Sequence, residues 1–168
     1  SNGGTVTAIT RAATGGSYTS IPSVAITAPT TAGGVQATAT ATMFAASATV
    51  QSGGTGYTVN DVLTVVGGTF SSAATFTVSA VSAGVVTAVT LTSGGTAYSV
   101  LPTNPVSTTG GTGTAATGTG VLTSMRRVTG IALTSAGSGC GAAGPRTVTF
   151  SAAPAYGSVA ATATATAT

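Results

Sequence analysis

The fold of this chain is decided by a glycine-rich turn, Ser52-Gly53-Gly54-Thr55-Gly56-Tyr57, which recurs along the sequence. The other copies are Gly15-Gly16-Ser17-Tyr18, Ser93-Gly94-Gly95-Thr96-Ala97-Tyr98 and Gly137-Ser138-Gly139-Cys140. The last residues of the four copies are Tyr18, Tyr57, Tyr98 and Cys140, and successive ones are 39, 41 and 42 residues apart. A nearly constant period of this length indicates a repeat protein.

Each copy of the turn is predicted to be structural. Paired glycines supply the positive φ that tight turns need. A tyrosine that follows can cover the turn with its ring while its hydroxyl bonds a backbone group. The predicted structural turn positions are Gly15, Gly16, Tyr18, Gly53, Gly54, Tyr57, Gly94, Gly95, Tyr98, Gly137 and Cys140.

The segments between the turns alternate threonine with valine, isoleucine or alanine, which is the period of a half-buried strand. Strands that precede a turn are expected at 5–10, 85–92 and 128–134. Strands that follow a turn are expected at 23–27, 62–66, 104–108 and 146–150, and third strands at 37–42, 74–81, 115–122 and 160–168. No segment shows the apolar spacing of a helix.

The sequence therefore predicts an all-β chain of about four repeats, each a short three-stranded antiparallel unit. The repeats run over 5–43, 44–81, 85–122 and 128–168, the last being divergent. Alanine and threonine strands bury little area for each residue, so one repeat alone is marginally stable and stacking is expected. The stack is expected to be a β-solenoid, a prism or a sandwich array.

The composition excludes most kinds of chemistry. Only 3% of residues are charged, with four arginines, one acid (Asp61) and no histidine. General acid-base catalysis needs a histidine or paired carboxylates, and metal ions need a cluster of ligands. The glycine turns lack a lysine and precede strands, unlike phosphate loops. We expect no enzyme, no cofactor and no metal.

Three further residue types have a simple structural interpretation. Cys140 stands where the other turns carry tyrosine, and is expected to be a small buried side chain rather than an intersubunit disulfide. Asp61 is expected to accept backbone N–H groups in its own turn. The pair Arg126-Arg127 is expected in a solvated linker between repeats, with contact to an acidic partner as the alternative.

Partners are constrained by the same composition. Four scattered arginines neutralise few phosphates, so we expect no nucleic acid. No apolar run is long enough to span a membrane as a helix. A surface this poor in charge has little protection against self-association, so the expected partners are other copies of the chain and other subunits of the same assembly.

The repeat resembles a glycine-tyrosine β-repeat of tailed-phage virion proteins, found in tail fibres and head decorations, with a looser likeness to bacterial surface proteins. Residues 53–69 (Gly-Gly-Thr-Gly-Tyr-Thr-Val-Asn-Asp-Val-Leu-Thr-Val-Val-Gly-Gly-Thr) and 94–113 carry the resemblance. It implies a structural role on a virion surface or outside the cell, without catalysis.

The leading hypothesis is thus a phage virion fibre or decoration protein that acts by self-association. An alternative is a subunit of a bacterial extracellular filament or sheath, for which the strand at 160–168 would offer an open edge through Ala160, Thr162, Thr164 and Thr166. A second alternative is a carbohydrate-binding adhesin module, with weak glycan contact through Tyr57 and Tyr98.

Overall fold

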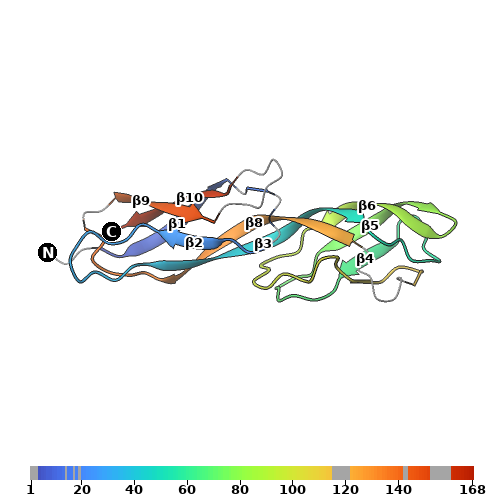
Figure 1. Ribbon diagram of the computed structural model, residues 1–168, viewed down its shortest axis with the longest axis horizontal. Helices are drawn as coiled ribbons and strands as arrows, with labels where there is room; N and C mark the ends of the chain where they lie inside the picture. The colour runs from blue at the N-terminus through green and yellow to red at the C-terminus, as the bar shows by residue number, and fades with distance from the viewer. Residues whose placement is uncertain are drawn as a thin grey trace. The chain divides into compact units, whose positions relative to one another are not determined.

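The described part of the chain folds as antiparallel β-strands joined by turns and loops (Figure 1). The computed structural model describes residues 4–13, 15–16, 18, 20–114, 122–141, 144–151 and 160–168. These residues form ten strands and no helix. The prediction of an all-β antiparallel fold is therefore confirmed for the part of the chain that is described.

Two compact units make up the chain. Unit 1 combines the two ends, Ser1–Thr42 with Val128–Thr168, and unit 2 is Met43–Arg127. Strand β3 (Thr38–Val50) and strand β8 (Leu122–Ser135) each contribute residues to both units. The expected third strand of repeat 1 therefore continues without a break past the predicted boundary at residue 43.

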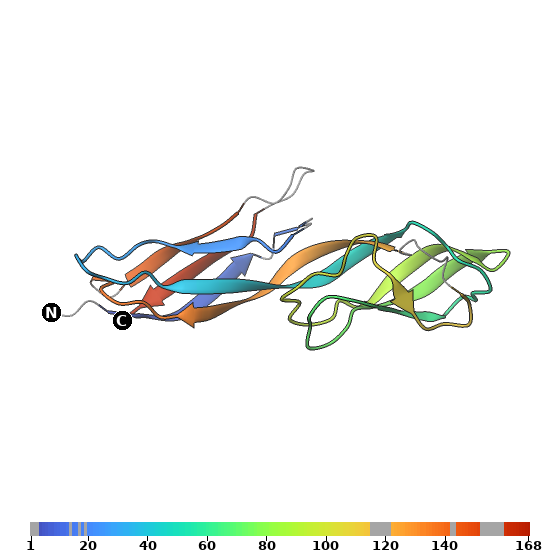
Figure 2. The same ribbon diagram turned by 60° about the horizontal axis from the view of Figure 1, so that its bottom comes forward.

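Unit 1 contains a six-stranded sheet that is nearly closed into a barrel (Figure 2). Its order is β1-β10-β9-β2-β3-β8, where β1 is Val6–Ala13, β2 is Ser23–Ile26, β9 is Gly144–Phe150 and β10 is Thr162–Ala167. The end strands β1 and β8 approach each other: Val6 N–H donates to Ala136 O (2.9 Å), and Arg11 Nη1 donates to Val128 O (3.1 Å).

Small side chains fill the inside of unit 1. Strand β10 alternates exposed threonine with alanine, of which Ala165 and Ala167 are fully buried. The core cluster consists of Val6, Ile26, Ala37, Cys140, Val148, Ala165 and Ala167. Alanine on the inner face lets strands approach the opposite wall closely, which suits a narrow barrel.

Unit 2 contains a four-stranded sheet with the order β6-β5-β4-β7. Strand β4 is Val62–Val65, β5 is Thr75–Ser82, β6 is Val85–Ser93 and β7 is Thr108–Thr109. Strands β5 and β6 are joined by Ala83 and Gly84, which both have positive φ (49° and 78°), as the two-residue hairpin turn requires. The core includes Leu63, Phe76 and Val78.

The structure corrects three predicted features. The segment 160–168 is not an open edge, because β10 pairs with β1 on one side and with β9 on the other. The strand expected at 104–108 is reduced to the two residues of β7. Arg126 and Arg127 lie within strand β8 rather than in a linker. The third strand expected at 115–122 falls mostly outside the described residues.

Candidate functional site

One glycine of each predicted turn has the same backbone conformation, whereas Gly16, Gly53 and Gly94 do not have positive φ. The glycine three residues before each tyrosine or cysteine has a positive φ: 60° at Gly15, 59° at Gly54, 70° at Gly95 and 64° at Gly137. L-residues rarely adopt this conformation, so glycine is favoured there. At Gly95 a side chain would also clash, because a Cβ atom would lie 2.6 Å from Ser72 O and 2.7 Å from Ala74 N.

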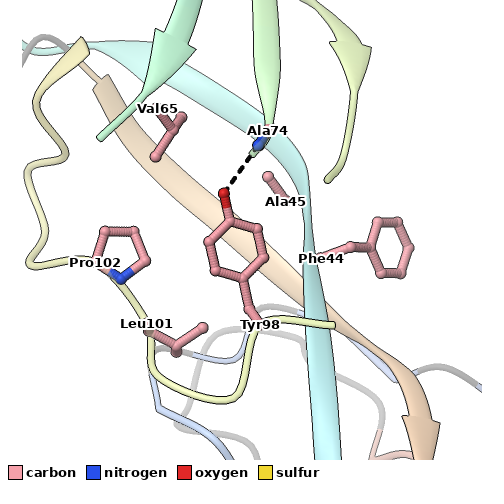
Figure 3. A pocket seen from close by; sticks show the side chains of 7 residues that line it. All are labelled: Phe44, Ala45, Val65, Ala74, Tyr98, Leu101 and Pro102. Atoms are coloured by element: carbon pink, nitrogen blue, oxygen red, sulfur yellow. Dashed lines mark hydrogen bonds between the residues drawn. The ribbon is translucent and has the colours of Figure 1, made fainter. Parts of the chain in front are cut away.

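Two of the tyrosines anchor a distant strand. Tyr98 is 3% exposed, and its hydroxyl oxygen accepts a hydrogen bond from Ala74 N–H (2.8 Å), just before β5 (Figure 3). Tyr18 is 1% exposed, and its hydroxyl accepts from Ala161 N–H (2.7 Å), just before β10. The Tyr98 ring lies against Gly95 of its own turn, and each of the two hydroxyls satisfies a buried backbone donor.

Tyr57 occupies the same turn position and packs against a different loop. Cβ atoms built on Gly111 and Gly113 would lie 3.1 Å and 2.5 Å from its ring, so the glycine loop of residues 110–113 lies directly against it. Burial, and to a lesser degree the nearby Asp61 carboxylate, raise the pKa of Tyr57.

Asp61 links two turns of unit 2. Its Oδ2 accepts hydrogen bonds from Thr58 N–H (2.8 Å), Thr112 N–H (3.1 Å) and the Thr112 hydroxyl (2.8 Å). The bonds from the Thr58 and Thr112 backbone lower the pKa of Asp61 below its usual value. The expected capping role is thus present. The contact with Thr112 was not predicted, because nothing in the sequence pairs these two turns.

Cys140 is buried among apolar side chains of unit 1, and it is a free thiol. Its backbone N–H donates to Gly4 O (3.0 Å). The thiol therefore occupies the place of a small core side chain, and a disulfide with another subunit would require this core to open.

Hydroxyl groups lie in rows across the strands of both sheets. In unit 1, Thr10 pairs with Thr164, which pairs with Thr147, and all three are exposed. In unit 2 one row crosses all four strands of the sheet. It consists of Thr109 in β7, Thr64 in β4, Thr75 in β5 and Ser93 in β6. Hydroxyl groups also meet on the neighbouring strands β3 and β8, where the Thr38 and Thr134 oxygens lie 2.8 Å apart. We call these sets the hydroxyl rows.

Described residues of unit 2 line a small cavity with a volume of about 10 Å³. Its lining includes Ala45, Val65, Ala74, Tyr98, Leu101 and Pro102, with the Tyr98 ring in the centre (Figure 3). A cavity of this size holds a group no larger than about one water molecule. It therefore has no room for a sugar ring.

The rings proposed for glycan contact are not available for stacking. Tyr57 and Tyr98 are both 3% exposed. The further tyrosine of the chain, Tyr156, and the side chains of Arg126 and Arg127 lie outside the described residues. Among the residues that are described, no group of three or more potential ligands could hold a metal ion, and no helix could span a membrane.

Comparison with known proteins gives no relative from which a function could be transferred. The chain matches no protein-family model, no characterised protein and no solved structure.

Proposed function

We propose that this chain is a non-catalytic structural subunit of a surface-displayed assembly and that it acts by self-association. The observation that carries the proposal is the set of hydroxyl rows on the two sheets, in a chain of which only 3% of residues are charged. A surface with so few charges lacks the repulsion that keeps proteins apart.

The contacts of the potentially reactive side chains support the proposal that the chain is not catalytic. Asp61 is engaged by two turns, Tyr18 and Tyr98 bond backbone donors, and Cys140 lies in the core. Side chains that would otherwise serve chemistry instead hold the fold together. Such a distribution of contacts supports a protein that acts through its surface contacts rather than through a reacting side chain.

The proposed form of the assembly is a phage virion fibre or head decoration, with a bacterial extracellular filament or sheath as the alternative. We also propose that the chain contains four repeats, with repeats 1 and 4 in unit 1 and repeats 2 and 3 in unit 2. The shared φ of Gly15, Gly54, Gly95 and Gly137 supports this division. The resemblance of residues 53–69 and 94–113 supports the virion setting.

Sedimentation of the purified chain over a hundredfold range of concentration tests self-association. We expect the mean mass to rise above the 15.6 kDa of one chain as concentration increases. A constant mass of 15.6 kDa throughout would refute the proposal. Glycan binding that is lost in Tyr57→Ala and Tyr98→Ala, with folding retained, would instead favour the adhesin alternative.

A further inference from the structure

One arginine of unit 1 lies on the inner face of the sheet. In strand β9, Thr147 and Thr149 are exposed and Val148 between them is buried, so alternate residues of this strand face the core. Arg146 is two residues before Val148 and therefore has the inward position. Its partner across the ladder is Ala165, which is fully buried. The arginine is accordingly half-buried.

The charged end of Arg146 lies beside a glycine and a hydroxyl group. A Cβ atom on Gly141 would lie 3.5 Å from Arg146 Nη2 and 2.8 Å from Thr30 Oγ1. Gly141 follows Cys140, which belongs to the core cluster of unit 1. The stem of the arginine thus covers part of the inner face, while its guanidinium group emerges next to the Thr30 hydroxyl.

The sequence of unit 1 contains no acidic side chain that could neutralise this charge. Unit 1 has two arginines, Arg11 and Arg146, and no aspartate or glutamate. The Arg11 guanidinium donates to Val128 O (3.1 Å), whereas Arg146 donates to no acceptor among the described residues. Asp61, the single acid of the chain, is in unit 2 and accepts hydrogen bonds from two turns there. A half-buried guanidinium costs free energy unless an acceptor pairs its donors.

We propose that Arg146 and Thr30 bind an oxyanion group, either a carboxylate or a phosphate, beside Gly141. The planar guanidinium group donates two parallel hydrogen bonds to such a group, and the Thr30 hydroxyl donates a third. A side chain at position 141 would contact both donors, so glycine leaves the space between them open. The bound anion supplies the negative charge that unit 1 lacks.

Nuclear magnetic resonance of the isotope-labelled wild-type chain tests the site directly. Sodium phosphate and sodium acetate are titrated separately at fixed pH, with sodium chloride keeping the ionic strength constant. The backbone amide signals of Gly141 and Thr30 should shift and saturate, while that of Gly84 in unit 2 should not move. The anion that saturates at the lower concentration identifies the ligand as phosphate or carboxylate.

Substitutions of the two donors test which side chains hold the anion. Arg146→Gln removes the charge and the paired donors, so it should weaken binding about tenfold or more. Arg146→Lys retains the charge without the planar pair of donors and should lose less affinity. Thr30→Val removes the hydroxyl donor at similar volume and should also weaken binding. Arg11→Gln is the matched control, because it removes the other arginine of unit 1, and it should bind like the wild-type chain.

Three results would overturn the anion site. The first is the absence of a saturating shift at Gly141 and Thr30 with either anion, which needs no variant. The second is unchanged affinity in Arg146→Gln or, if that variant does not fold, in both Arg146→Lys and Thr30→Val. The third is an equal loss in Arg11→Gln, which would mean that the anion responds to net charge alone. Binding is expected in a single copy of the chain, so this site and the proposed self-association can fail independently.

Discussion

Two copies of the turn, one at Gly95 in unit 2 and one at Gly137 in unit 1, are anchored in different ways. In unit 2, Gly95 leads to Tyr98, whose hydroxyl bonds Ala74 N–H. In unit 1, Gly137 leads to Cys140, which packs in an apolar cluster with Ala37. The glycine conformation is nearly identical, with φ of 70° and 64°. The comparison shows that the turn keeps its glycine conformation when cysteine takes the place of tyrosine.

The largest expected effect comes from the glycines. Gly95→Ala and Gly137→Ala should each lower the free energy of unfolding by about 3 kcal/mol or more, because a left-handed backbone costs about 1 to 2 kcal/mol and a backbone clash adds to it. Gly33→Ala is the control, since Gly33 has φ of 78° with nothing within 4 Å. Urea denaturation measures all three. If Gly95→Ala and Gly33→Ala lowered the free energy of unfolding equally, the close packing around Gly95 would contribute nothing to the loss.

A smaller effect is expected from the tyrosine hydroxyls. Tyr98→Phe retains the ring but leaves the buried Ala74 N–H without an acceptor, which should cost about 1 to 3 kcal/mol. Tyr18→Phe should cost a similar amount through Ala161 N–H. Cys140→Ala removes no hydrogen bond and should cost about 1 kcal/mol. Thermal unfolding measures all three variants. If both phenylalanine variants melt like the wild-type chain, the tyrosine hydroxyls do not anchor the distant strands.

The smallest effect concerns Asp61, which anchors turns only in unit 2. Its pKa is lowered in the folded chain, so its contribution to stability is present above the unfolded pKa of about 3.9 and is lost as pH falls through the folded pKa. The melting temperature should therefore fall below about pH 4. Asp61→Asn should flatten this dependence. An unchanged acid profile in the variant would show that Asp61 does not link the turns.

The local structure of the chain was predictable from the sequence, because it depends on short-range rules. Threonine alternating with alanine predicts a half-buried strand, and β10 has this pattern of burial. Paired glycines predict positive φ, which Gly54 and Gly95 adopt. The tyrosine position predicted a buried ring with a hydrogen-bonded hydroxyl, as at Tyr98.

The pairing of distant segments was not predictable in the same way. Val6 pairs with Ala167 at the opposite end of the chain, so the strand expected to be open has a neighbour on each side. The bond between Asp61 and Thr112 likewise joins turns that no pattern relates. The repeat period identifies similar segments, but many pairings of these segments fit the same alternation of buried and exposed side chains. Tertiary contacts determine which pairing forms.

Negative-stain electron microscopy of the concentrated wild-type chain tests the central claim most directly. Self-association through charge-poor surfaces predicts ordered assemblies built from this chain alone. A field that contains only single molecules, at concentrations where the chain remains folded, would contradict the account.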